Sequence, residues 1–436
     1  MRPIRTLLAA AVLAATLLPT SARAAGYAIY EQGASVLGMG GAGVASVHDA
    51  SAVFFNPAAM TRLDGTQFYV GGSALQPIMS FAGMGPNPGY GVADEAVRQT
   101  FYPPTAYATR HLARGLAVGL GLNAPFGLGV EWNPVTFSGR YIVTKVDLQT
   151  LNASACLAWA PNDKVSIAAG PDIMWAKVKL ANRTLVASPG GGGGTVDVAS
   201  TQLTSGFSPG PGWNAGVLVT PFERWRLGAY YRSKIVVHVD DADADFTQIP
   251  SGNAAFDASV AAGLPPDQKV RTVLHFPAMW SVGAAFQPTP AWTVAADFDV
   301  HEWRVFQDLP IRFVTTPDRD QVRLENYRNG WQIRAGAEHR LQAFTYRFGW
   351  YFDKAPAPTE AVSPLLPDAD RQGVSLGLGL SFGPDKRWTL DAYELALFVR
   401  DRYGVTASGD TDPTYDYRGN YRSYVNLAGI NVGYRW

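Results

Sequence analysis

The chain has 436 residues, and its 36 Lys and Arg residues balance its 36 Asp and Glu residues. This length suits one large domain or two to three ordinary ones, and an aromatic content of 12% excludes a wholly disordered chain. The balanced charge lacks the basic excess of nucleic-acid-binding proteins, and a single cysteine, Cys156, excludes an intrachain disulfide.

The first 24 residues are predicted to be a signal peptide. Arg2 and Arg5 form a basic start, residues 7–18 are an apolar run, and Ala22-Arg23-Ala24 is a small-residue cleavage site. The run is shorter than the roughly 20 residues that a spanning helix needs. Cleavage after Ala24 leaves 436 − 24 = 412 residues and indicates an exported protein.

Residues 25–64 are predicted to form a compact plug rather than strands. They are rich in Gly, Ala and Ser and contain no long run of alternating polarity. The stretch from Gly38 to Gly43 reads G-x-G-x-x-G, which indicates a dinucleotide site only inside a βαβ unit. No such unit surrounds it, so close packing of backbone is the favoured interpretation.

Residues 65–436 are predicted to form an all-β transmembrane barrel of about 14 antiparallel strands. Apolar and polar residues alternate strictly through long runs, as in Trp225 to Arg232 and Phe344 to Asp353. Short turns and long loops alternate between the runs, which is typical of bacterial outer-membrane barrels. The predicted strands lie near 65–76, 99–112, 115–127, 146–160, 164–179, 211–220, 224–238, 271–287, 291–305, 327–340, 343–353, 373–383, 387–403 and 420–436.

The C-terminal end supports the barrel interpretation. The last predicted strand ends on the final residue, Trp436, which resembles the signal that hands outer-membrane proteins to the barrel assembly machinery. Other Trp residues fall at strand ends, where aromatic belts meet the two membrane interfaces. The mean hydropathy of −0.03 is then an average over an apolar outer face and a polar lumen.

Several motifs resemble those of the FadL/TodX family of outer-membrane transporters. They are Asn56-Pro57-Ala58 after the glycine-rich stretch, Pro125-Phe126-Gly127 at the end of the third strand, Gly139-Arg140-Tyr141 in the next loop, and Leu264-Pro265 before the eighth strand. The resemblance implies a monomeric 14-stranded barrel in the bacterial outer membrane, plugged by a hatch and surrounded by lipid and lipopolysaccharide. It also implies transport of hydrophobic compounds, captured among the outer loops and released sideways through the wall.

The resemblance assigns residues to these roles. Asn56, Pro57 and Ala58 form the hatch motif, and Gly26, Tyr27, Ile29 and Tyr30 are ligand-binding candidates near the mature N-terminus. Asn123, Pro125, Phe126 and Gly127 are candidates for a strand-three kink with a lateral opening, because Pro and Gly weaken a strand interior. Phe246, Ile249, Phe256, Val260 and Leu264 are candidates for a capture groove in an outer loop, in a segment that can carry a short amphipathic helix.

Alternative functions remain at this point. Alternation turns a set of charged residues toward the lumen, and ion pairs or a solvated wall are favoured over steering of substrate: Arg226, Arg232, Asp297, Asp299, Arg334, Glu338, Arg347, Asp353 and Asp391. It also turns His275 and His301 inward, but no catalytic, metal or cofactor site is predicted. Long-chain fatty acids are the favoured substrates, followed by aromatic hydrocarbons; a diffusion porin and a barrel enzyme are more distant alternatives.

Overall fold

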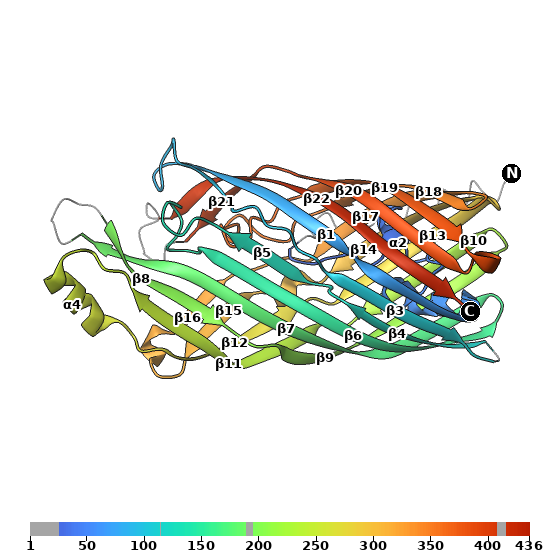
Figure 1. Cartoon of the computed structure of the whole chain (residues 1–436), viewed down its shortest axis with the longest axis horizontal. Coiled ribbons are helices and arrows are strands. Elements are labelled where there is room, and N and C mark those ends of the chain that lie inside the picture. Colours follow the sequence, from blue (N-terminus) through green and yellow to red (C-terminus); the bar gives the residue numbers. More distant parts are fainter. Residues whose placement is uncertain (1–25, 114, 189–194, 408–415) are drawn as a thin grey trace.

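The computed structural model describes residues 26–113, 115–188, 195–407 and 416–436, so the predicted signal peptide lies outside the described residues. The chain forms a closed antiparallel barrel of 14 strands, which confirms the predicted fold (Figure 1). The first wall strand pairs with the last, from Gln67 opposite Arg435 to Gly83 opposite Gly419. This closure removes the unpaired edges that an open sheet would expose to lipid.

In chain order, the wall strands are β1 (Thr66–Gly83), β3 (Pro104–His111), β4 (Leu116–Asn123) continued by β5 (Gly127–Glu131), β6 (Lys145–Asn162), β7 (Val165–Ala187), β9 (Ser208–Phe222), β10 (Trp225–Arg232) continued by β11 (Ile235–Gln248), β12 (Gln268–Phe276) continued by β13 (Met279–Thr289), β14 (Trp292–His301), β17 (Gly330–Leu341), β18 (Phe344–Asp353), β19 (Arg371–Phe382), β20 (Trp388–Val399) and β22 (Tyr417–Arg435). Shorter strands are β2 (Ala93–Glu95), β8 (Thr195–Thr204), β15 (Asp308–Phe313), β16 (Gln321–Leu324) and β21 (Arg402–Thr406).

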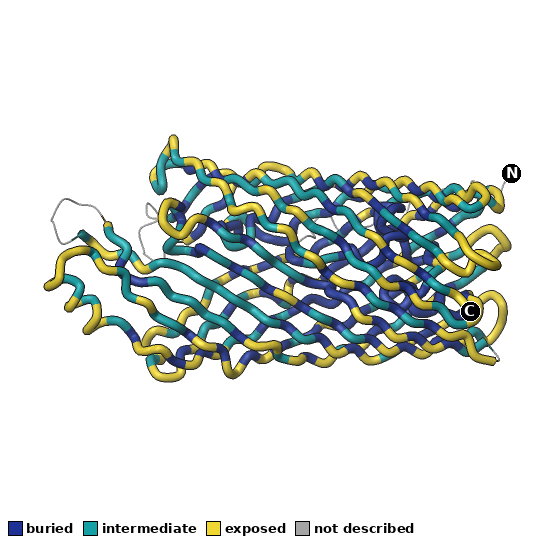
Figure 2. Tube along the Cα trace, in the orientation of Figure 1, coloured by how far each residue is buried: buried dark blue, intermediate teal, exposed yellow. Residues whose placement is uncertain are grey.

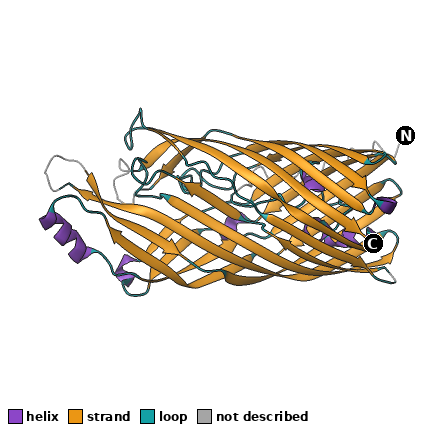
Figure 3. Ribbon diagram, viewed as in Figure 1, coloured by secondary structure: helices purple, strands orange, loops and turns teal. Residues whose placement is uncertain are grey.

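Helical structure is brief. The helices are α2 (Ala34–Leu37), α3 (Ala52–Phe55) and α4 (Ala254–Gly263), and the 3₁₀ turns are η1 (Pro57–Arg62), η2 (Trp303–Val305), η3 (Pro317–Arg319) and η4 (Pro384–Lys386). Figure 3 shows α4 projecting from one end of the barrel, with other helical turns inside the barrel and at its ends. In the part of the chain that the structure describes, no helix is both long enough and apolar enough to span a bilayer.

The two ends of the barrel differ in their connections. At one end, β6 joins β7 and β17 joins β18 through tight turns, and the C-terminus lies here (Figure 1). At the other end, residues 84–103, 302–329 and 354–370 form long connections. We call these the short-turn end and the long-loop end. In outer-membrane barrels they correspond to the periplasmic and outer sides, respectively.

Aromatic side chains form two belts on the outward face of the wall. Near the short-turn end the belt includes Trp225, Phe286, Trp292, Phe382, Trp388, Tyr434 and Trp436. Toward the long-loop end it includes Trp213, Tyr231, Trp280, Phe298, Trp331, Phe352, Phe398 and Tyr424. Such belts mark the two membrane–water interfaces, so the wall between them faces the hydrocarbon.

Beyond the outer belt, the two faces of the wall exchange polarity. On β7, Lys177 and Lys179 face outward whereas Val178 and Leu180 pack inward. The outward face meets water here, and the inward face meets packed loops. Several strands therefore extend further than predicted, since the prediction followed runs with one constant apolar face. The first, predicted to end near residue 76, reaches Gly83, and the fifth, predicted to end near 179, reaches Ala187.

The same inversion corrects the position of one histidine. If the eighth strand were unbroken, the alternation would place His275 inward. In the structure, however, the residues on either side of it, Leu274 and Phe276, face inward. The strand is interrupted between β12 and β13, and in β13 Met279 and Ser281 take the inward positions. His275 therefore lies on the opposite face from Leu274, whereas His301 is buried inside as expected.

Residues 26–64, which we call the inner segment, run inside the barrel. Nearly all of their side chains are buried, and the segment is the dense dark-blue chain within the wall in Figure 2. Its residues Ala34, Val53 and Phe54 belong to one apolar cluster with inward side chains of the wall such as Tyr69 and Leu395. The lumen is therefore filled toward the short-turn end.

Candidate functional site

Asn56 fastens the inner segment to the wall. Its side-chain amide donates hydrogen bonds to the carbonyls of Val44 at 2.8 Å and Val217 at 3.0 Å, and its Oδ1 accepts one from Ala58 N–H at 3.2 Å. Pro57 begins η1, where its missing N–H costs no helical hydrogen bond. The predicted hatch motif therefore joins two stretches of the inner segment to β9.

The wall carries glycine where the inner segment approaches most closely. A Cβ atom on Gly216 would lie 2.3 Å from Asn56 Oδ1, and one on Gly228 would lie 2.5 Å from the Val44 carbonyl oxygen. These distances are shorter than any normal contact, so only glycine allows this approach. Gly40, inside the G-x-G-x-x-G stretch, has φ +67° and packs against wall backbone, in agreement with the packing interpretation.

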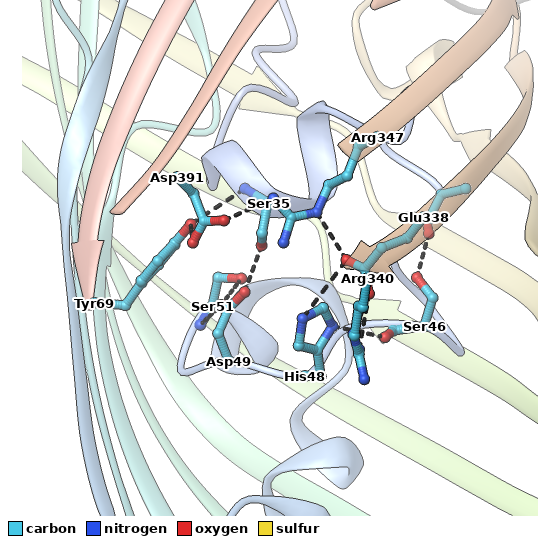
Figure 4. Close-up of polar contacts among 11 residues, drawn as sticks. Ser35, Ser46, His48, Asp49, Ser51, Tyr69, Glu338, Arg340, Arg347 and Asp391 are labelled. Carbon is cyan, nitrogen blue, oxygen red and sulfur yellow. Dashed lines mark hydrogen bonds and ion pairs between the residues drawn. The ribbon is translucent and has the colours of Figure 1, made fainter. Parts of the chain in front are cut away.

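A polar network ties the inner segment to the wall near the short-turn end (Figure 4). Ser35 N–H donates to Tyr69 Oη at 3.1 Å, and the Tyr69 hydroxyl donates to Asp391 at 3.1 Å. Arg347 then bridges Asp391 at 2.6 Å and Glu338 at 2.8 Å. These lumen charges therefore form buried ion pairs that contact the inner segment.

Arg334 forms a second connection. Its guanidinium lies 3.8 Å from the ring centroid of Tyr30 and 4.7 Å from that of Tyr351, and it pairs with Asp299 at 2.9 Å. It also donates to the carbonyl of Gly40 at 3.0 Å. Tyr30, a ligand-binding candidate, thus serves packing and cation–π contact in this structure.

The third wall strand contains a β-bulge between β4 and β5. Asn123 is opposite Asn152 and Gly127 is opposite Gln149, so 127 − 123 = 4 steps on this strand face 152 − 149 = 3 steps on β6. One extra residue is therefore accommodated, which bends the strand. The bulge falls at the predicted kink candidates, including Pro125 and Phe126.

The N-terminal end of the inner segment pairs with this bulge. Ile29 N–H donates to the Pro125 carbonyl at 2.8 Å, and Gly127 N–H donates to the Tyr27 carbonyl at 2.9 Å. Ala28 and Phe126 form the bridge between these bonds. Two groups of candidates that are about 100 residues apart in the sequence therefore lie side by side.

Gln32 supports the same junction and was not singled out from the sequence. Its amide nitrogen donates to the Ala124 carbonyl at 2.8 Å, and its Oε1 accepts from Ala124 N–H at 3.3 Å. The side chain is fully buried, and Tyr107 donates to the Gln32 carbonyl at 2.8 Å. A lone glutamine in a segment rich in Gly and Ala carries no sequence signal for such a role.

A cavity of about 520 Å³ lies beside the bulge. Inside the barrel it is lined by Gly26, Tyr27 and Ile29 and by wall residues such as Leu397 and Leu427. The lining also includes Gln149 and Leu151, which lie on the opposite face of β6 from the buried Leu148 and Thr150. The cavity therefore reaches both faces of the wall at the bulge.

Charged groups gather at one part of the cavity lining. Asp368 accepts a hydrogen bond from Gly26 N–H at 3.1 Å, and Arg371 pairs with Asp353 at 2.8 Å. Burial raises the pKa of both the Asp368 and the Glu31 carboxyl groups, while Arg371 opposes that rise. Among the described lining residues, Arg371 is the one basic side chain.

The capture-groove candidates lie outside this cavity lining. Phe256, Val260 and Leu264 belong to or follow α4, none of whose residues is buried, so the helix does not pack as an amphipathic element. Phe246 contacts Phe313 at 6.1 Å between ring centroids. The described residues contain no cluster of three or more His, Cys, Asp or Glu side chains arranged to hold a metal ion.

The aromatic belts, the filled lumen and the apolar cavity together define an outer-membrane transport barrel. Residues 15–436 match the family described as outer membrane protein transport protein (OMPP1/FadL/TodX). The chain belongs to this family, whose members transport hydrophobic compounds, and it is an integral outer-membrane protein.

Similar proteins span the whole chain. A long-chain fatty acid transport protein of Escherichia coli O6:H1 is 26% identical over 98% of this chain and 97% of its own. Outer membrane protein P1 of Haemophilus influenzae is 26% identical over 99% of this chain and 98% of its own. A Pseudomonas aeruginosa FadL homologue shares the fold with a TM-score of 0.82 at 21% identity, covering 94% of this chain and 100% of its own. The P. putida toluene transporter TodX has a TM-score of 0.72 at 18% identity, covering 93% of this chain and 99% of its own.

Proposed function

We propose that this protein carries long-chain fatty acids across the outer membrane. The ligand is captured among the long loops, moves into the cavity as the inner segment rearranges as a hatch, and leaves sideways through the wall. The observation that supports this route is the cavity itself, which is lined by inner-segment residues such as Tyr27 and by outward residues such as Leu151.

Lateral release suits an apolar ligand. Each CH₂ group removed from water gains about 0.8 kcal/mol, so a long chain strongly favours passage from the cavity to hydrocarbon without crossing the periplasmic water. A route along the barrel axis would meet the inner segment, which fills the lumen toward the short-turn end. The bulge offers the alternative exit beside Phe126 and Gly127.

The cavity lining supports an amphiphile over a plain hydrocarbon. Its volume of about 520 Å³ falls within the range of ordinary small-molecule sites. Apolar side chains supply most of the lining, and Arg371 supplies a guanidinium suited to a carboxylate. The raised pKa of Asp368 and of Glu31 favours their neutral forms, which lessens repulsion of that carboxylate. The names of the fatty acid transport proteins that resemble this chain point the same way.

Uptake tests this proposal. A bacterial strain that lacks its own fatty acid transporter is complemented with this chain and supplied with labelled oleate or toluene. We expect oleate uptake above the empty-vector level. Uptake of toluene alone would assign the protein to aromatic hydrocarbons, and steady ion current through a reconstituted bilayer would favour a diffusion porin. We also propose that the protein acts as a monomer and reaches the membrane through the barrel assembly machinery.

A further inference from the structure

The outward face of β6 and β7 changes from apolar to polar at one level. On β7 the outward side chains are apolar up to Trp175, and the next two are Lys177 and Lys179. On β6, Leu151 is the register partner of Trp175, and the next outward residue is Gln149. This level is the outer edge of the apolar belt, where lipid head groups begin.

The cavity opens on the outward face at this same level. Its lining contains Leu151, on the apolar side of the boundary, and Gln149, on the polar side. It also contains Phe207, which is half exposed and directly precedes Ser208, the register partner of Ala176. A ligand in this mouth would therefore meet hydrocarbon and head groups together.

Lys177 stands beside the mouth. It is the register partner of Gln149, and the preceding residue, Ala176, is the register partner of Ser208, which directly follows Phe207. Gln149 and Phe207 both line the cavity. Lys177 therefore lies beside the mouth, on the strand that β6 and β9 flank in Figure 1.

The charges around the mouth leave Lys177 available. Lys179 is the register partner of Asp147, an acidic residue that also lines the cavity, while Lys145 already pairs with Glu131 at 2.6 Å. Among the residues that the structure describes, the Lys177 ammonium has no hydrogen bond or ion pair. Its four-carbon stem can lie along the wall while the ammonium stays at the polar level.

We propose that Lys177 binds the carboxylate head group of a single-chain amphiphile as the ligand leaves the cavity. This inference rests on the proposed function and extends it to the exit. The alkyl chain gains by entering the hydrocarbon beside Leu151, whereas a carboxylate at that depth would lose its hydration. An ammonium at the boundary holds the head group in place while the chain transfers into the membrane.

This interaction is weak enough to allow release. An exposed ion pair between a lysine and a carboxylate changes an equilibrium by about threefold, so the head group leaves quickly once the chain has transferred. A neutral ligand gains nothing from the ammonium. Lys177 therefore distinguishes an anionic amphiphile from an uncharged one of the same chain length.

The test compares oleate with oleyl alcohol, which has the same chain and no carboxylate. Uptake of both labelled ligands is measured in the transporter-deficient strain carrying wild type, Lys177→Gln, Lys177→Arg or Lys164→Gln. Lys164 is exposed in the turn at the opposite end of the β6–β7 pair, so its variant removes the same charge far from the mouth. We expect Lys177→Gln to lower oleate uptake about threefold and to leave oleyl alcohol uptake unchanged. Lys177→Arg and Lys164→Gln should resemble wild type.

Three results would overturn the inference. Unchanged oleate uptake by Lys177→Gln would remove any role for the ammonium in ligand release. An equal loss for oleate and oleyl alcohol would indicate a structural effect on the wall. If the unchanged oleate uptake came with less co-purified lipopolysaccharide, Lys177 would be assigned to a lipid phosphate instead. Failure of the wild-type protein itself to take up oleate would contradict the proposed function as well. This result is separate from the others because it is seen without any variant.

Discussion

At the scale of single residues, the attachment of the inner segment depends on Asn56. In Asn56→Ala, the buried carbonyl of Val44 loses its side-chain donor, which costs about 1–3 kcal/mol, and the half-buried carbonyl of Val217 loses one as well. We expect slower oleate uptake but an unchanged heat-modifiable shift of the barrel on gels, because strand pairing is not touched. Asn253→Ala, which alters a cap on exposed α4, is the matched control. Wild-type uptake by Asn56→Ala would argue against the attachment.

Glycine at position 216 makes a second residue-scale prediction. In Gly216→Ala the new methyl group would lie 2.3 Å from Asn56 Oδ1, so the wall or the inner segment must move. Such overpacking costs about 1–3 kcal/mol. We expect a lower thermal unfolding midpoint, measured by circular dichroism in detergent. Gly263→Ala serves as the control, because no atom lies within 4 Å of the position that its methyl group would take. Equal midpoints for the two variants would contradict this account.

Glu325, which directly follows β16 in the long connection from β14 to β17, predicts a pH dependence. Burial raises the pKa of its carboxyl to about 7, against the opposing influence of Arg323 at 3.3 Å. The folded state then binds a proton more readily than the unfolded state, so stability is greatest below pH about 4.5 and is lost as pH rises to about 7. The loss amounts to about 3 kcal/mol.

The pH dependence is tested by limited proteolysis, in which the rate of cleavage within residues 302–329 is measured at pH 5 and pH 8. We expect wild type to be cleaved faster than Glu325→Gln at pH 8, because the amide is neutral at both pH values. The two proteins should be cleaved alike at pH 5, where Glu325 is protonated. Comparison at each pH removes the protease's own pH dependence, and equal rates at pH 8 would contradict the raised pKa.

At the scale of elements, the bulge in strand three and the N-terminal end of the inner segment act as one unit. Ala28 and Phe126 are bridge partners flanked by the two hydrogen bonds, which is the closely spaced kind of antiparallel pair. Cysteines at both positions, Ala28→Cys with Phe126→Cys, should therefore form a disulfide. We expect oxidation to block oleate uptake and reduction to restore it, because the inner segment can no longer leave the exit.

The native thiol does not complicate this experiment, because Cys156 is buried on β6. Each single-cysteine variant controls for the loss of the original side chain. The disulfide is verified by mass spectrometry of the peptides. Full uptake by the oxidised protein would show that release needs no movement between these two elements.

At the scale of the whole molecule, the filled lumen predicts low conductance. The inner segment occupies the barrel toward the short-turn end, where its buried side chains share one apolar cluster with inward side chains of the wall. We expect no steady current from wild type in a planar bilayer. Removal of residues 34–55, which contain α2 and α3, should open a conducting path in a barrel that still shows the heat-modifiable shift. Steady current from wild type would contradict the hatch.

The sequence alone determined the barrel and its membrane setting. Strict alternation of apolar and polar residues, as in Phe344 to Asp353, predicts strands, because a strand has a period of two. The alternation of short turns with long loops and the terminal Trp436 then favour an outer-membrane barrel over an exported soluble β-protein. The plug was also predictable, since residues 25–64 lack that alternation and a wide lumen must be filled. The ends of the strands were less predictable from the sequence. Beyond the outer aromatic belt the outward face becomes polar, as at Lys177, so the alternation no longer marks the strand by an apolar outer face.

Only the tertiary structure decided how the candidate site is assembled. The pairing of Ile29 with Pro125 and the clamp of Gln32 on Ala124 join segments about 95 residues apart, and no local pattern records such contacts. The opening of the cavity on the outward face likewise lies at a register offset of one residue between strand three and β6. Local chemistry fixes which face a residue occupies, whereas the closure of the barrel fixes which faces meet.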